Sequence, residues 1–250
     1  GWYVLHTGRI AVGTVGSWRT GEQHTWCAKA TDEMTGEERA EQRERLKQMR
    51  LQRDTERQQR QQQAAARAAR GWHNAGPADP DHPYLIRKGI QPHHLRQQGG
   101  LLLVPMVDAD GAIQNLQRIA PDGTKKFMYG GRVAGCFALF GELESGPLYV
   151  CEGVATGATI HEQSGLPTAC AMNAGNLLAV CTALAAPDRQ ITVCADNDHR
   201  TQGNPGITKG REAAAAAGAA VTWPDTCGSD CTCTDFNDVA HCTSAQEAVA

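Results

Sequence analysis

The spacing of hydrophobic residues divides this chain into four stretches with different predicted structures. Near the start, residues 2–6 and 11–15 are rich in aromatic and β-branched side chains and flank a Thr7-Gly8-Arg9 turn, which predicts a β-hairpin. Residues 1–34 are too few for an independent domain, so we expect this hairpin segment to pack on another part of the protein.

The second stretch predicts one long, charged helix or linker over residues 35–71. Residues 37–70 contain no Gly or Pro, and Thr35 followed by Glu38 matches a helix capping box. Its few large apolar residues are Leu46, Met49 and Leu51. So narrow an apolar stripe cannot be widely buried, which leaves two readings open, a solvated spacer and an arm that contacts nucleic acid.

The third stretch, residues 72–145, predicts a small basic α+β subdomain. A short helix is expected over 82–90, where a glycine stops it. The apolar run 101–107 predicts a buried strand, and Asp-Gly turns separate it from strands over 113–119 and 125–129.

The fourth stretch, residues 146–250, alternates strands with helices and therefore predicts an α/β fold with a mostly parallel sheet and flanking helices. The strands are expected over 148–151, 168–171, 190–195 and 219–223, and the helices over 154–164, 177–185 and 206–217.

Acidic residues follow two of these predicted strands. Glu152 comes after the first strand, and Asp196 and Asp198 come after the third. The carboxyl ends of parallel strands share one edge of a sheet, so these carboxylates should converge there. Close carboxylates repel one another, and a hard divalent cation with oxygen ligands relieves the repulsion. Asp235 could complete the site. The alternative is that these acids only cap helices or form turns.

The distribution of charge and of cysteines is compatible with the predicted metal site. The formal net charge is −3, but residues 37–70 hold ten Lys/Arg and six Asp/Glu, which leaves 14 Lys/Arg and 21 Asp/Glu elsewhere. An acidic body with a basic segment suits an enzyme that handles polyanions. No run of about 18 apolar residues exists, so no membrane span is expected. Five cysteines stand singly among apolar residues, so we expect a reducing, bacterial cytoplasmic setting.

A zinc site is not favoured by the spacing of the last cysteines. Cys227, Cys231, Cys233 and Cys242, with His241 beside them, do not match the common paired Cys-x2-Cys pattern.

Several of these segments resemble motifs of the Toprim family. Residues 148–156 resemble its first motif, a strand ending in Glu-Gly, and residues 191–198 resemble its second, a strand ending in Asp-x-Asp. Residues 173–177, 204–206 and 234–238 resemble further segments of plasmid and phage primases. The resemblance implies a Rossmann-like Toprim fold over about 147–240.

The upstream region resembles the basic, β-rich subdomain that precedes the Toprim fold in bacterial-type primases. The cations expected near phosphates are Arg118, Lys125, Lys126 and Arg132. Contacts of this kind position a nucleic-acid backbone and are insensitive to base sequence. Taken singly, each could equally be a solubilising surface residue.

The resemblance implies a DNA primase core that synthesises RNA primers in plasmid or phage replication or conjugation. Its partners would be single-stranded DNA and ribonucleoside triphosphates, with a replicative helicase as a further candidate. Mg²⁺ or Mn²⁺ would be held by Asp196 and Asp198, with Asp235 as another candidate ligand. Glu152 would serve as general base or as a ligand.

Two departures from the family pattern keep other functions open. Thr156 stands where primases have an Asp, and Asn237 where a second Asp is frequent. Both favour a DNA-binding protein without catalysis. A Toprim nuclease is the other alternative, because water can replace the attacking hydroxyl at the same metal centre.

Overall fold

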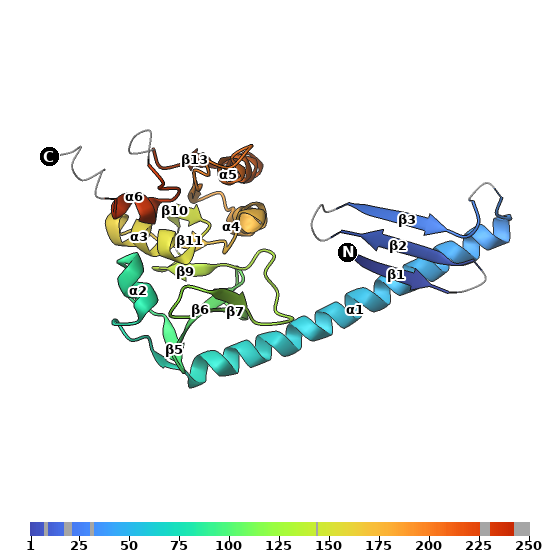
Figure 1. The fold of residues 1–250 in the computed structure, drawn as a ribbon, viewed down its shortest axis with the longest axis horizontal. Coiled ribbons are helices and arrows are strands. Elements are labelled where there is room, and N and C mark those ends of the chain that lie inside the picture. The colour runs from blue at the N-terminus through green and yellow to red at the C-terminus, as the bar shows by residue number, and fades with distance from the viewer. Residues whose placement is uncertain (8–9, 18–21, 31–32, 144, 226–230, 243–250) are drawn as a thin grey trace. The chain divides into compact units, whose positions relative to one another are not determined.

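A computed structural model describes the chain except for residues 8–9, 18–21, 31–32, 144, 226–230 and 243–250 (Figure 1). The chain divides into two compact units, Gly1–Gln58 and Gln59–Ala250. Helix α1 (Gly36–Asn74) contributes to both units. Part of the predicted hairpin turn, residues 8–9, lies outside the described residues.

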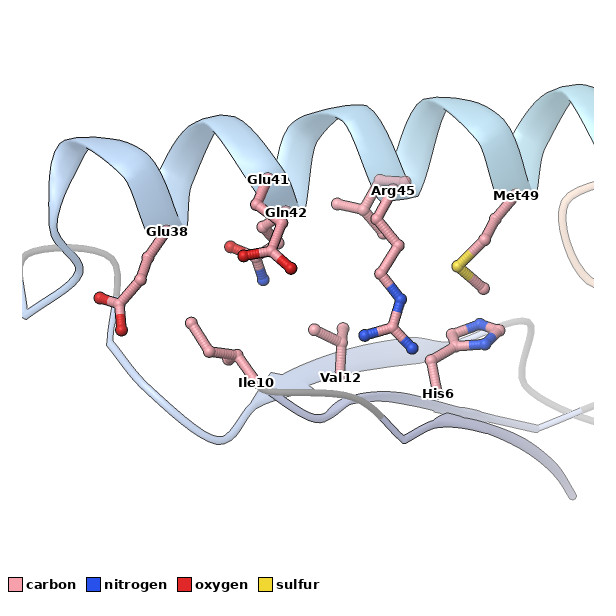
Figure 2. Close-up of a pocket in the computed structure, with 9 residues that line it drawn as sticks. His6, Ile10, Val12, Glu38, Glu41, Gln42, Arg45 and Met49 are labelled. Carbon is pink, nitrogen blue, oxygen red and sulfur yellow. The ribbon is translucent and has the colours of Figure 1, made fainter.

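The first unit is a three-stranded antiparallel sheet beside the first part of α1. Its strands are β1 (Trp2–His6), β2 (Val12–Gly16) and β3 (Gln23–Cys27), in that spatial order. The predicted hairpin is confirmed, whereas the mostly exposed third strand was not predicted. Figure 2 shows His6 and Val12 facing Arg45 and Met49 of α1. The cavity between them is about 30 Å³.

Helix α1 begins at the predicted capping box. The Glu38 N–H donates to Thr35 Oγ1 at 3.2 Å, and the Thr35 N–H donates to Glu38 Oε2 at 2.8 Å. Towards the other end, Ala64 and Ala68 are completely buried, and Ala68 packs in a cluster with Leu116. The predicted long helix is confirmed. Within the described part of the chain, no helix is long and apolar enough to cross a membrane.

The second unit begins with a five-stranded antiparallel sheet of order β4-β5-β6-β7-β8. These strands are β4 (Gly76–Pro77), β5 (Arg96–Gln98), β6 (Leu101–Val107), β7 (Ile113–Ile119) and β8 (Lys125–Phe127). Between β4 and β5 lies the predicted short helix, α2 (Pro83–Lys88). It ends at Gly89, whose φ of 61° is left-handed and favours glycine.

The second sheet of this unit has the order β13-β12-β10-β11-β9, and all its strands are parallel except β9. The strands are β9 (Ala138–Phe140), β10 (Gly146–Cys151), β11 (Thr168–Cys170), β12 (Arg189–Cys194) and β13 (Ala220–Thr222). The helices are α3 (Val154–Ser164), the short 3-10 turn η1 (Ala174–Asn176), α4 (Leu177–Leu184), α5 (Pro205–Ala217) and α6 (Phe236–Ala240). The predicted α/β fold with a mostly parallel sheet is confirmed.

Helices cover both faces of the parallel sheet (Figure 1). Adjacent residues of β10 point to opposite faces: Cys151 packs with α3, while Val150 packs with α4 and α5. The cluster around α3 also contains Leu102 and Ile119 of the antiparallel sheet, so the two sheets share one core. The predicted domain boundary at 145/146 therefore falls between two strands of one sheet, since β9 precedes it.

The isolated cysteines occupy this core as predicted. The buried set is Cys136, Cys151, Cys170, Cys181 and Cys194, and none of them is in a disulfide. Helix α3 lies so close to β11 that a Cβ at Gly157 would overlap the Cys170 sulfur. Small side chains on both elements permit this approach, which sets the position of α3 above the strand ends.

Candidate metal centre at the carboxyl ends of the parallel strands

Glu152 and Asp196 emerge side by side from two neighbouring strands. β10 and β12 pair in parallel with Cys151 opposite Cys194, so the residues that follow each strand meet at the same edge. Both side chains line a cavity of about 190 Å³, and Asp235 from the start of α6 lines it as well. The structure therefore brings together three of the four predicted acidic residues.

Burial and mutual repulsion make these carboxylates hard to ionise. Burial, followed by the charges of Glu152 and Asp235, raises the pKa of Asp196 to about 8. Burial and then the charge of Asp198 raise the pKa of Glu152 to about 7. Glu152 Oε1 and Asp196 Oδ1 are buried and accept no hydrogen bond from the described residues. Buried oxygens without donors, on clustered carboxylates, fit a divalent cation that prefers oxygen ligands.

Asp198 lies beside this cavity and has a structural partner. Its Oδ2 accepts a hydrogen bond from the Gly206 N–H at 3.0 Å, in the first turn of α5. Its own N–H donates to Asn204 Oδ1 at 3.0 Å, and Asn204 caps α5 with a left-handed φ of 41°. One Asp198 oxygen thus holds α5 in place, while the charge of the group still reaches Glu152.

Helix α5 approaches the loop after β12 so closely that position 206 requires glycine. A Cβ there would overlap the backbone oxygen of Asp196. The Asn204-Pro205-Gly206 segment therefore fixes how the loop after β12 meets the helix, and with it the direction of the Asp196 side chain.

Thr156 and Asn237, the two departures from the family pattern, lie in different places relative to the carboxylate cavity. Thr156, on α3, is 2% exposed and lines the carboxylate cavity. Asn237 does not reach the cavity: its Nδ2 donates to the Lys88 carbonyl at 2.7 Å and to Thr159 Oγ1 at 2.9 Å. The Lys88 carbonyl can only accept, so it needs a donor that an ionised aspartate could not supply. Asn237 joins α6 to α2 and α3.

Lys88 is a residue of the cavity that the sequence analysis missed. It lies at the end of α2, lines the cavity and forms an ion pair with Asp238 at 3.2 Å. Desolvation opposes its charge, but Asp238 and Asp235 outweigh this effect and raise the pKa of Lys88. It stands about 150 residues from its partner in sequence, so no local pattern could have indicated it.

The four predicted cations lie in three different places. Lys125 lines the carboxylate cavity, and its Nζ lies 5.5 Å from the ring centre of Tyr84. Arg118 and Lys126 are cross-strand partners on β7 and β8 and line a second cavity, of about 530 Å³. Arg132 instead pairs with Asp108 at 3.0 Å.

The second cavity combines cations with aromatic side chains. Arg67 of α1 adds a third positive charge and donates to the Tyr129 carbonyl at 3.2 Å. Tyr129, which also lines the cavity, is 81% exposed, and Phe127 is 38% exposed. Exposed rings among cations are typical of surfaces on which nucleic-acid bases stack.

Comparisons with known proteins give a matching domain family and several similar proteins. Residues 147–246 match the Toprim domain family. Two Escherichia coli proteins named DNA primase TraC are similar to this chain. One is 36% identical over 237 residues, which are 90% of this chain and 22% of the relative. The other is 32% identical over 233 residues, 88% of this chain and 16% of the relative.

The chain thus spans about a fifth of the length of the relatives it matches. Among solved structures, the primase fragment of the bacteriophage T7 primase-helicase protein shares 21% identity at a TM-score of 0.47, over 66% of this chain and 73% of that one. Residues 147–246 match the Toprim domain family, in a chain that is similar along nine tenths of its length to part of the TraC DNA primases.

Proposed function

We propose that this chain is the catalytic core of a DNA primase that joins ribonucleotides on single-stranded DNA in plasmid or phage replication or conjugation. The observation that carries the proposal is the carboxylate cavity, which Glu152, Asp196 and Asp235 line together with Lys88 and Lys125. Clustered acids suit divalent metal, and cations across the same cavity suit the phosphates of a nucleotide. The similarity to TraC primases supports this direction.

In the proposed reaction, a primer 3′-hydroxyl attacks the α-phosphorus of a nucleoside triphosphate. A bond forms between that oxygen and the phosphorus, and the bond to the leaving pyrophosphate breaks. Mg²⁺ or Mn²⁺, when bound, supplies charge neutralisation and makes the hydroxyl more acidic. Asp196, Asp198 and Asp235 are the proposed ligands.

Glu152 is the proposed acceptor of the hydroxyl proton. Its raised pKa, about 7, lies close to neutral pH, where a general base combines adequate basicity with a useful unprotonated fraction. Its Oε1 is buried and accepts no hydrogen bond from the described residues, so its lone pairs are not occupied by a protein donor. A role as metal ligand is the alternative assignment for the same group.

Binding of the substrates is assigned to two sets of cations. Lys88 and Lys125 would contact the triphosphate in the carboxylate cavity. Arg118, Lys126 and Arg67, with the exposed Tyr129 ring, would contact the DNA template in the second cavity. Phosphate contacts of this kind weaken as salt rises, and stacking on tyrosine tolerates any base. A replicative helicase as a further partner stays a prediction.

Primer synthesis on single-stranded DNA, with labelled ribonucleotides and Mg²⁺ or Mn²⁺, tests the proposal. We expect short labelled products from the chain and none from Asp196→Asn. The control is Asp110→Asn, which removes one negative charge at an exposed turn and should leave synthesis unchanged. Equal synthesis by Asp196→Asn, or no synthesis by any form, would contradict the proposal.

The same gel distinguishes the alternatives. Cleavage of the template that depends on Asp196, without synthesis, would favour a Toprim nuclease. DNA binding without either reaction would favour a non-catalytic protein.

A further inference from the structure

Three cysteines near the end of the described chain lie together in space. The sulfur atoms of Cys231, Cys233 and Cys242 are all within 4.8 Å of one another. Cys231 and Cys233 belong to the segment that leads from β13 to α6, and Cys242 lies just after α6. Cys227 lies outside the described residues and is not counted in this cluster.

The surroundings of this cluster favour ionised sulfur. The Cys233 N–H donates a hydrogen bond to Cys231 Sγ, with 3.4 Å between nitrogen and sulfur, and this contact stabilises a negative sulfur and orients it as a ligand. The Arg200 guanidinium donates to the Cys231 carbonyl at 3.1 Å, which places a positive charge beside the cluster. Nearby cations lower the energy of thiolates, the form of cysteine that binds metal.

We propose that Cys231, Cys233 and Cys242 form a binding site for a thiophilic divalent cation, with Zn²⁺ as the expected ion. Zinc–sulfur bonds of about 2.3 Å in a tetrahedron place sulfurs about 3.8 Å apart, so small side-chain movements close the site. Water can supply the fourth ligand. Thiolates select zinc over magnesium, so this site and the carboxylate cavity would hold different metals.

The site would hold in place the segment that completes the carboxylate cavity. The Asn197 N–H, between the two acids of the β12 loop, donates to the Thr234 carbonyl at 2.6 Å. Its side chain donates to the Pro224 carbonyl at 3.0 Å. Asp235 follows directly and caps α6, whose far end leads to Cys242. A metal that joins the two ends of residues 231–242 would therefore fix Asp235 beside Asp196.

The clustered sulfurs run against the expectation from spacing alone, which did not favour zinc. Cys-x-Cys with a third cysteine nine residues later is an irregular pattern, but helix α6 returns the chain to the same place. Zinc binding at this cluster does not depend on primase activity.

Metal content and cobalt spectroscopy test the site on the whole chain. We expect about one zinc per chain after purification without chelators under reducing conditions, measured by mass spectrometry of the elements. Replacement by Co²⁺ should give sulfur-to-cobalt charge-transfer absorption and the strong visible bands of tetrahedral cobalt. Cys242→Ser and Cys233→Ser should each weaken zinc binding roughly tenfold or more.

Cys27→Ser is the matched control, since it removes a half-buried thiol from the first unit and should leave the cobalt spectrum unchanged. Absence of zinc together with a cobalt spectrum without sulfur bands would overturn the proposal, as would sulfur bands that survive both cysteine substitutions. If a variant does not fold, the spectrum of the unsubstituted chain decides alone. None of these readouts uses primer synthesis, so the zinc site and the primase proposal can fail separately.

Discussion

Asp196→Asn should stabilise the metal-free protein, and increasingly so as pH rises. An aspartate with a pKa of about 8 in the folded chain and about 3.8 when unfolded takes up a proton on folding between these pH values. The stability from this proton is fully present below pH 3.8 and is lost as pH rises towards 8. The amide of the variant does not titrate, so the variant avoids this loss.

The size of the effect follows from the pKa difference. One proton changes stability by about 1.36 kcal/mol per pH unit between the two pKa values. Between pH 6 and pH 8, with half-ionisation at the upper end, the advantage of Asp196→Asn should grow by up to about 2.3 kcal/mol. That corresponds to roughly a 50-fold change in the equilibrium for local opening.

Amide hydrogen exchange of β10 and β12 in the presence of EDTA measures this effect where it arises. At each pH the rate ratio of wild type to variant is taken, so that intrinsic exchange chemistry cancels. The ratio should rise by up to about 50-fold from pH 6 to pH 8 for Asp196→Asn and stay flat for Asp110→Asn. Added Mn²⁺ should protect the wild type and not the variant. A flat ratio, or faster exchange in Asp196→Asn, would refute the reasoning.

Three further predictions concern the neighbours of the carboxylate cavity. Gly206→Ala should push α5 away from Asp196 and weaken Mn²⁺ binding about tenfold in calorimetry, since overpacking shifts the backbone; unchanged affinity would contradict the close approach. Asn237→Asp should destabilise the α6 region by about 1 to 3 kcal/mol in hydrogen exchange, because the Lys88 carbonyl loses its donor to an acid; unaltered exchange would argue against this role. Arg118→Ala should lower the slope of log affinity for single-stranded DNA against log salt by about 0.7, with Lys209→Ala on α5 as the control; an unchanged slope would remove Arg118 from the template site.

The convergence of Glu152 and Asp196 at one cavity could be predicted because it depends on a short-range rule. Glu152 and Asp196 each follow an apolar strand, and parallel strands bring such residues to one edge whatever the rest of the chain does. The same rule could not reveal how Asp198 is used. Its hydrogen bond to Gly206 depends on how closely α5 approaches, and that depends on packing of the whole sheet.

The distribution of the cations was predicted less well, for two different reasons. Lys125 and Lys126 are adjacent on a strand, so their side chains must point to opposite faces, and this signal was available in the sequence. Lys88 could not be found in the same way, because α2 reaches the cavity only through the core shared by the two sheets. Likewise, the three clustered sulfurs meet only because α6 folds back.

The most direct test of the central claim is to map the metal on the polypeptide. Fe²⁺ bound in place of Mg²⁺, with ascorbate and peroxide, cleaves the chain close to the ion, and mass spectrometry locates the cuts. We predict cuts near Glu152, Asp196 and Asp235 that excess Mg²⁺ suppresses and that Asp196→Asn abolishes. Cuts confined to other regions, or cuts at these positions that persist in Asp196→Asn, would contradict the assignment of the carboxylate cavity as the metal centre.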